Sequence, residues 1–130
     1  MDNPNRRGGA ARCILVVDDD ESAADSLAML IRDRLGCEVH AAYGGADAID
    51  HACRFRPDTV VMDIAMPFVD GMEAGEILAR LFGRRRPRLI ALATANTESD
   101  RGAIAAAGFT GHLVKPVDVE RLLQLLDEPL

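Results

Sequence analysis

Two stretches of the chain place aspartates directly after apolar runs. Residues 14–20 read ILVVDDD, so Asp18, Asp19 and Asp20 follow four apolar residues, and Asp63 ends the stretch DTVVMD. Adjacent carboxylates repel one another unless a cation offsets the repulsion. Sites with two or three carboxylate oxygens and open positions suit hard divalent cations, magnesium above all. The aspartates therefore indicate an acidic pocket for a metal ion.

Two other apolar runs end in groups that bind phosphoryl oxygens. The run RLIALAT ends in Thr94, and the run GHLVK ends in Lys115. A hydroxyl group and an ammonium group both donate hydrogen bonds to phosphoryl oxygens. An aspartate can itself accept a phosphoryl group. If all these runs end at one edge of the fold, the combination predicts a site for phosphate and metal.

The periodicity of the chain predicts a fold that has such an edge. Apolar runs typical of buried strands occur at 13–17, 37–42, 58–63, 88–94 and 111–115, and helical periodicity occurs at 21–35, 45–55, 72–82, 98–107 and 118–126. Strict alternation predicts an α/β fold, here a flavodoxin-like doubly wound five-stranded parallel sheet in the order 2-1-3-4-5 with helices on both faces.

Ligands of doubly wound folds bind outside the carboxyl ends of the strands. We therefore expect Asp18, Asp19 and Asp63 to converge, with Thr94 and Lys115 beside them. The third aspartate of the first cluster is interpreted differently, as the N-cap of the following helix.

Length and charge limit the function classes. With 130 residues, of which 48% are hydrophobic, the chain can form one globular domain. The formal net charge of -6 argues against non-specific binding of nucleic acid or an anionic membrane. The run RRRPR at 84–88 is the basic exception, and we interpret it as a solvated loop rather than a dedicated anion site.

The terminus and the cysteines indicate an intracellular protein. Residues 1–12 lack periodicity, so we expect a disordered tail before a domain at 13–130. The sequence contains no signal peptide and no long apolar span. Cys13, Cys37 and Cys53 lack metal-ligand spacing, and we expect reduced, buried thiols in the cytoplasm.

Four motifs together resemble the response regulator receiver family. They are Asp18-Asp19 after the first strand, MDIAMPFVDGM around Asp63, ATA with Thr94 at its centre, and VKP with Lys115. The resemblance covers about residues 12–128. Within the family, the chain is similar both to chemotaxis regulators and to the receivers of hybrid histidine kinases. Each motif is weak alone, but the combination is specific.

The resemblance implies a role for each residue of the acidic pocket. Asp63 would accept a phosphoryl group from a phosphohistidine. Magnesium would be held by Asp63, by Asp19 directly, and by Asp18 mainly through water. The backbone carbonyl group of Ala65 would complete the protein ligands.

The resemblance also implies the groups that bind the phosphate and transmit its arrival. Thr94 and Lys115 would bind phosphoryl oxygens, and the bond between Lys115 and Pro116 would be a cis peptide, which proline makes less costly. His112 stands where many members have Tyr or Phe. The aromatic switch of the family would here depend on an imidazole ring, which titrates near neutral pH.

The leading hypothesis is a response regulator receiver that works in a two-component phosphorelay. It would catalyse its own phosphorylation and dephosphorylation without being a turnover enzyme. Its partners would be a histidine kinase or a histidine phosphotransfer protein, and a downstream protein bound by the fourth helix, fifth strand and fifth helix. We expect neither nucleic acid nor membrane as a partner, and no output domain in this chain. A stand-alone regulator and a receiver of a larger protein both stay open.

Three other functions are alternatives to a receiver. A magnesium-dependent phosphohydrolase with an aspartyl-phosphate intermediate would place a second aspartate two residues after the nucleophile, where this chain has Ala65. In receivers that position and Asn96 flank the hydrolytic water, which Asn96 can orient and a methyl group cannot. A flavin or nucleotide binder would need a Gly-rich loop after the first strand, and none is present. A non-phosphorylated interaction module would not need the intact set of Asp19, Asp63, Thr94 and Lys115.

Overall fold

Strands and helices alternate along the chain in a computed structural model, which describes residues 12–94 and 98–128. The elements are β1 (Cys13–Val17), α1 (Glu21–Leu35), β2 (Glu38–Ala42), α2 (Gly45–Phe55), β3 (Thr59–Asp63), α3 (Gly71–Phe82), the 3-10 helix η2 (Gly83–Arg85), β4 (Arg88–Ala93), α4 (Glu98–Ala106), β5 (Gly111–Val114) and α5 (Val119–Asp127). The predicted strands and α-helices and their order are confirmed, with boundaries that differ by at most one residue, whereas η2 was not predicted.

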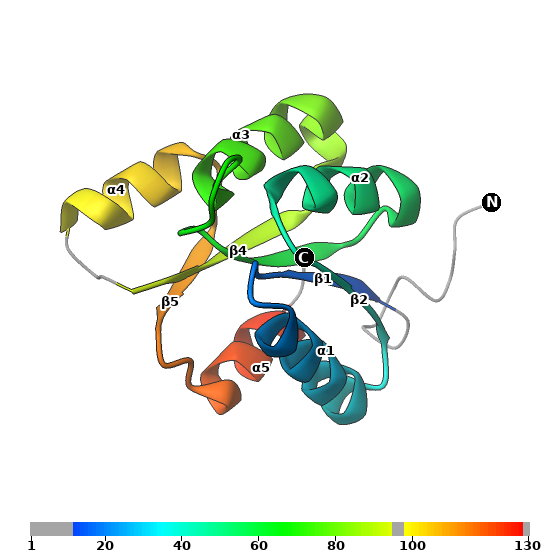
Figure 1. Cartoon of the computed structure of the whole chain (residues 1–130). Coiled ribbons are helices and arrows are strands. Elements are labelled where there is room, and N and C mark those ends of the chain that lie inside the picture. The colour runs from blue at the N-terminus through cyan, green and yellow to red at the C-terminus, as the bar shows by residue number, and fades with distance from the viewer. Residues whose placement is uncertain (1–11, 95–97, 129–130) are drawn as a thin grey trace.

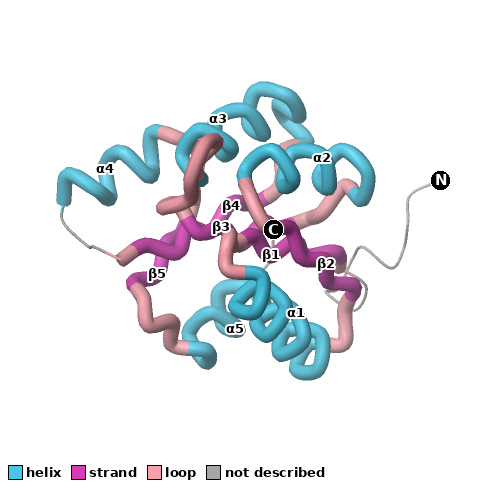
Figure 2. The backbone as a smooth tube through the Cα atoms, viewed as in Figure 1, coloured by secondary structure: helices cyan, strands magenta, loops and turns pink. Residues whose placement is uncertain are grey.

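The sheet has the predicted topology. Its five strands lie in the order β2-β1-β3-β4-β5, and all neighbours are parallel. Because the strands are parallel, their carboxyl ends meet at one edge, and the register sets Val17 of β1 beside Met62 of β3. The residue that follows β1 therefore lies next to the last residue of β3. Figure 2 shows the strands side by side between two layers of helices.

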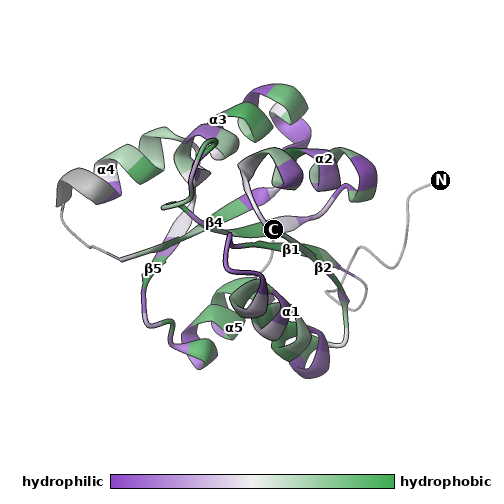
Figure 3. Cartoon of the chain, viewed as in Figure 1, coloured by the Kyte–Doolittle hydropathy of each residue, from purple (hydrophilic) through white to green (hydrophobic). Residues whose placement is uncertain are grey.

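Helices cover both faces of the sheet (Figure 1). On one face α1 and α5 pack on the strands through a core that includes Ala28, Ile31 and Leu122. On the other face α2, α3 and α4 pack through a core that includes Ala52 and Leu78. The strands between these layers are accordingly apolar along most of their length (Figure 3). No helix within residues 12–94 and 98–128 is long and apolar enough to cross a membrane.

Side-chain caps fix the helices that begin at the carboxyl edge. Asp20 precedes α1, and its carboxylate accepts the N–H of Ala23 at 3.2 Å, so its predicted role as N-cap is confirmed. Asp70 precedes α3 in the same way and accepts the N–H of Glu73 at 2.9 Å. The first cap directly follows Asp18 and Asp19, and the second ends the loop that begins after Asp63.

The structure differs from the sequence expectations at two points. Arg12, which we assigned to the tail, is buried; its carbonyl group accepts the N–H of Glu38, and its guanidinium donates to the carbonyl group of Asp127. Cys53 is exposed, whereas the other two cysteines are buried. The reason is helical periodicity, because Ala48 and Ala52 form the buried stripe of α2 and the next position points away from it. Residues 1–11 and the residue expected to orient water at 96 lie outside the described residues.

Candidate functional site

Three carboxylates gather where β1 and β3 end. Oxygen atoms of Asp18, Asp19 and Asp63 all lie within 4.8 Å of one another. Asp18 and Asp63 are buried, with 8% and 3% of their surface exposed, whereas Asp19 is exposed at the mouth of the cluster. The structure thus brings together the three aspartates that the sequence predicted to converge. An all-oxygen donor set with one side open to solvent fits magnesium, which keeps several of its waters.

Lys115 reaches into this cluster from the end of β5. Its Nζ atom lies 3.0 Å from Oδ2 of Asp63 and 3.6 Å from Oδ2 of Asp18. The N–H of Lys115 donates to the carbonyl group of Ala93 at 2.7 Å, which ties the residue to the end of β4. The peptide bond from Lys115 to Pro116 is cis. A single ammonium group therefore faces two buried carboxylates.

The pKa values of these groups report the balance of charge. Burial alone would lower the pKa of Lys115, but the hydrogen bond and attraction from Asp63, together with Asp18, raise it above its ordinary value. Burial raises the pKa of Asp18, and repulsion by Asp63 and Asp19 adds to this effect. The N–H of Asp20, which donates to Asp18 at 3.0 Å, and the lysine only partly oppose the rise. The pocket therefore lacks enough positive charge for its carboxylates.

The loop after β3 holds Asp63 in a defined orientation. The N–H of Ala65 donates to Oδ1 of Asp63 at 3.1 Å, while Oδ2 faces Lys115. The first residue of α3, Gly71, packs directly on this segment, because a β-carbon there would lie only 2.5 Å from the carbonyl oxygen of Asp63. From the sequence, Gly71 is recognisable only as a residue that favours turns. Its close approach, and the contact made by the N–H of Ala65, were missed, because both depend on the path of the loop.

Thr94 and His112 lie beside the cluster rather than in it. Thr94 follows β4, is exposed, and lines a cavity of about 260 Å³ with Ala65 and Ile104 of α4. His112 is partly exposed and pairs in register with Ala91 in the middle of β4. Since it precedes Lys115 by three strand positions, it lies about 10 Å from the strand end that carries the lysine. The structure therefore brings four of the predicted residues close together, namely Asp18, Asp19, Asp63 and Lys115. The other two lie outside this group, Thr94 beside α4 and His112 within β5.

An exposed aromatic residue near the site was also missed. Phe68, in the loop between β3 and α3, is fully exposed and has a φ of 64°, which is rare for a side chain of this size. A conformation of this kind is strained and occurs often at functional sites. The proline, aspartate and glycine near it in the sequence favour turns and predict a loop. They do not predict that an aromatic side chain is fully exposed there.

Comparisons with known proteins give the same picture along the whole domain. The model of the family described as the response regulator receiver domain matches residues 14–127. An uncharacterised 14.6 kDa protein of Leptolyngbya boryana is 37% identical over 116 residues, which make up 88% of this chain and 87% of that protein. Response regulator MprA of Mycobacterium avium is 38% identical over 110 residues, 85% of this chain and 47% of MprA. The chain thus spans about half the length of MprA.

Solved structures agree with this family match. Chemotaxis protein CheY4 of Vibrio cholerae superposes with a TM-score of 0.84 at 29% identity, over 92% of this chain and 99% of that chain. The receiver domain of Francisella response regulator 1452 superposes with a TM-score of 0.81 at 22% identity, a likeness of fold alone. With the fold, the acidic cluster and the family match in agreement, the chain belongs to the response regulator receiver family, the signalling domains of two-component systems.

Proposed function

We propose that this receiver takes a phosphoryl group onto Asp63 from the phosphohistidine of a histidine kinase or a histidine phosphotransfer protein. The observation that carries the proposal is the position of Lys115, whose ammonium group lies 3.0 Å from Oδ2 of Asp63 beside two further carboxylates. A buried carboxylate with a cation on one side and an acidic, solvent-open pocket on the other suits phosphoryl transfer better than a structural ion pair.

The residues of the pocket divide the chemistry between them. An oxygen of Asp63 attacks the phosphorus atom, a new O–P bond forms, the N–P bond of the phosphohistidine breaks, and the electron pair stays on the departing imidazole. Asp18, Asp19, Asp63 and the backbone carbonyl group of Ala65 would hold magnesium, which when bound neutralises charge on the transferred phosphoryl group. No second acid stands at position 65, which argues against a phosphohydrolase.

The phosphoryl group would then be bound by residues of the neighbouring strand ends. Lys115 keeps its place and pairs with a phosphoryl oxygen instead of the free carboxylate. Thr94 can donate its hydroxyl group to a second oxygen, and the cavity that it lines reaches Ile104 of α4. A shift of Thr94 would therefore change the packing of α4, and we expect His112 of β5 to change its packing with it. We infer a switch in which the surface of α4, β5 and α5 changes its contacts with a downstream protein in the cytoplasm.

Intact-mass measurement tests the acceptor directly. The protein is incubated with a small phosphodonor and magnesium, and the parent is expected to gain the mass of one phosphoryl group. The variant Asp63→Asn, which keeps the size of the side chain, should gain none. The variant Asp33→Asn, at an exposed position of α1, should gain the group as the parent does. Equal labelling of Asp63→Asn would contradict the proposal.

A further inference from the structure

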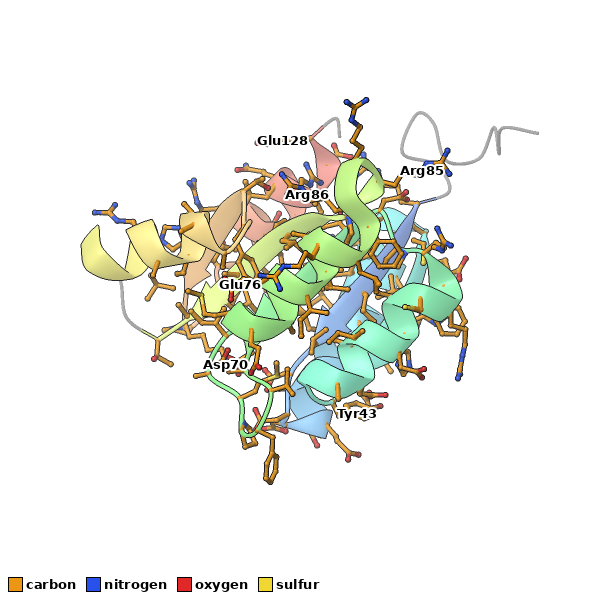
Figure 4. All side chains as sticks on the ribbon, turned by 90° about the horizontal axis from the view of Figure 1, so that it is seen from above. Tyr43, Asp70, Glu76, Arg85, Arg86 and Glu128 are labelled. Carbon is orange, nitrogen blue, oxygen red and sulfur yellow. The ribbon has the colours of Figure 1, made fainter. Side chains whose placement is uncertain are left out.

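A second charged site lies at the opposite edge of the sheet. A cavity of about 830 Å³ opens between the end of α2, the 3-10 helix η2 and the turn from α4 to β5. Five arginines line it, namely Arg56, Arg84, Arg85, Arg86 and Arg88. Figure 4 shows two of them, Arg85 and Arg86, at the end of the molecule far from Tyr43 and Asp70, which mark the edge that carries the acidic cluster.

The positive charge of this cavity is poorly compensated. Among residues 12–94 and 98–128, only two carboxylates, those of Asp58 and Glu128, line it with the five guanidinium groups. Asp58 also accepts the N–H of Cys13 at 2.9 Å, so part of its capacity serves the start of β1. Burial and repulsion by Arg12 lower the pKa of Arg88, and Glu128 opposes this only in part. Within the described part of the chain, an excess of cations therefore remains.

Three consecutive arginines at 84–86 carry the solvent-accessible part of this excess positive charge. Arg84, Arg85 and Arg86 are exposed, and none of them forms an ion pair within residues 12–94 and 98–128. Their backbone is fixed, because the N–H of Arg86 donates to the carbonyl group of Gly83 at 3.2 Å in the 3-10 helix. The solvated loop expected from the sequence is thus solvated, but it also forms one wall of a cavity.

The rest of the lining includes an aromatic ring and several apolar residues. The ring of Phe82 lies beneath the guanidinium group of Arg56, which is 5.4 Å from the ring centroid. Ala52, Pro57 and Pro87 complete the apolar lining. Aromatic rings and guanidinium planes stack on nucleobases, and guanidinium groups bind phosphate through paired hydrogen bonds. A cavity of this volume is in the range that holds a small ligand.

We propose that this cavity binds a small anion with two or more phosphates, of the nucleoside polyphosphate class. Arg84, Arg85 and Arg86 bind the phosphates, while Phe82 and Arg56 contact the base. The site is independent of phosphorylation at Asp63, because it lies at the amino ends of the strands rather than at their carboxyl ends.

Calorimetric titration in magnesium-free buffer tests the proposal, with inorganic pyrophosphate and adenosine diphosphate, which carry the same number of phosphates, as the two probes. The triple variant Arg84→Ala/Arg85→Ala/Arg86→Ala should bind both probes about tenfold more weakly than the parent or worse, because it loses charge-assisted hydrogen bonds. Tighter binding of the nucleotide than of pyrophosphate in the parent supports a contact with the base. Equal binding of the two assigns the ligand to the phosphates alone and overturns the role of Phe82.

A control variant with the same charge separates a site from a general attraction. Arg34→Ala/Arg54→Ala/Arg101→Ala removes three exposed arginines that lie outside the cavity. This variant should bind both probes as the parent does. If the two triple variants lose affinity equally, or if the parent binds neither probe, the proposal is wrong.

NMR titration of the parent gives a readout that does not depend on any variant. Amide shifts caused by pyrophosphate should centre on residues 84–86 and on Gly108 and Thr110, which line the same cavity. Shifts that centre on the loops around Asp18 and Asp63 instead would overturn the proposal.

Discussion

The ammonium group of Lys115 lies 3.0 Å from Oδ2 of Asp63, and this contact joins the last strand of the sheet to its central strand. Through this contact, a change of charge at the carboxylate of Asp63 can act directly on the end of β5. Because the same ammonium group also lies 3.6 Å from Asp18, it is shared between two carboxylates and can follow a new negative charge.

The first prediction concerns this link. Beryllofluoride, a mimic of the phosphoryl group, should change amide hydrogen exchange in α4 and β5 of the parent protein. In Lys115→Ala the fold should persist, but the change should stay confined to the loops around Asp63, since the cation that follows the charge is gone. Exchange mass spectrometry measures both. An equal response of α4 and β5 in the variant, with Asp63 demonstrably occupied, would show that the lysine is not the link.

The second prediction uses the raised pKa of Asp18. Because burial raises the pKa in the folded state above that in the unfolded state, the folded protein holds this proton more tightly, and its stability falls as pH rises through the raised pKa. At neutral pH and without magnesium, Asp18→Asn should therefore raise the free energy of unfolding. The gain should shrink as pH falls below that pKa, where the parent carboxyl group is also neutral. Urea unfolding at several pH values measures it, and a gain that does not vary with pH would refute the charge argument.

The third prediction concerns the metal. At a magnesium concentration tenfold above the dissociation constant, the free energy of unfolding should rise by about 1.4 kcal/mol, because only the folded chain presents the three carboxylates together. Asp19→Asn should lose most of that gain, while Asp33→Asn on the outer side of α1 should keep it. Thermal unfolding with and without magnesium checks this. The same magnesium response in all three proteins would mean that the ion binds elsewhere.

The fourth prediction compares two glycines. Gly71→Ala should destabilise the fold by about 1–3 kcal/mol and disturb Asp63, because the new methyl group meets backbone atoms that cannot move aside. Gly102→Ala in α4 should instead stabilise by about 1 kcal/mol, since alanine favours a helix and, among the described residues, no atom beyond the chain neighbours and the backbone of α4 lies within 4 Å of its β-position. Urea unfolding of both variants distinguishes the two effects. Similar changes in both would argue against a close contact at Gly71.

The elements and their order followed from the sequence because buried parallel strands and amphipathic helices have different periods. The acidic site could be predicted for a related reason. The carboxyl ends of parallel strands meet at one edge of the sheet, so knowing that Asp18, Asp63 and Lys115 stand at strand ends was sufficient to expect them close together. Contacts that depend on loop paths could not be predicted this way. The N–H of Ala65 that donates to Asp63 is one such contact. Helical spacing does not decide burial at helix ends either, since Leu81 near the end of α3 is 55% exposed.

The arginine-lined cavity could not be predicted from the sequence, for another reason. The run at 84–86 was visible, but Arg56 comes from the end of α2, about thirty residues earlier. Only the packing of α2 beside α3 brings that guanidinium group over Phe82. Charge runs read from sequence therefore gave the exposure of the arginines correctly but not the cavity that they line.

The most direct test of the central claim is to trap the phosphorylated side chain itself. After incubation with a small phosphodonor and magnesium, borohydride reduces an acyl phosphate, releases phosphate and leaves homoserine where the aspartate stood, and peptide mass mapping locates it. The account predicts homoserine at position 63 alone, in amounts that fall sharply when magnesium is removed. Homoserine at Asp18 or Asp19, or labelling of Asp63 that is equally strong without magnesium, would contradict it.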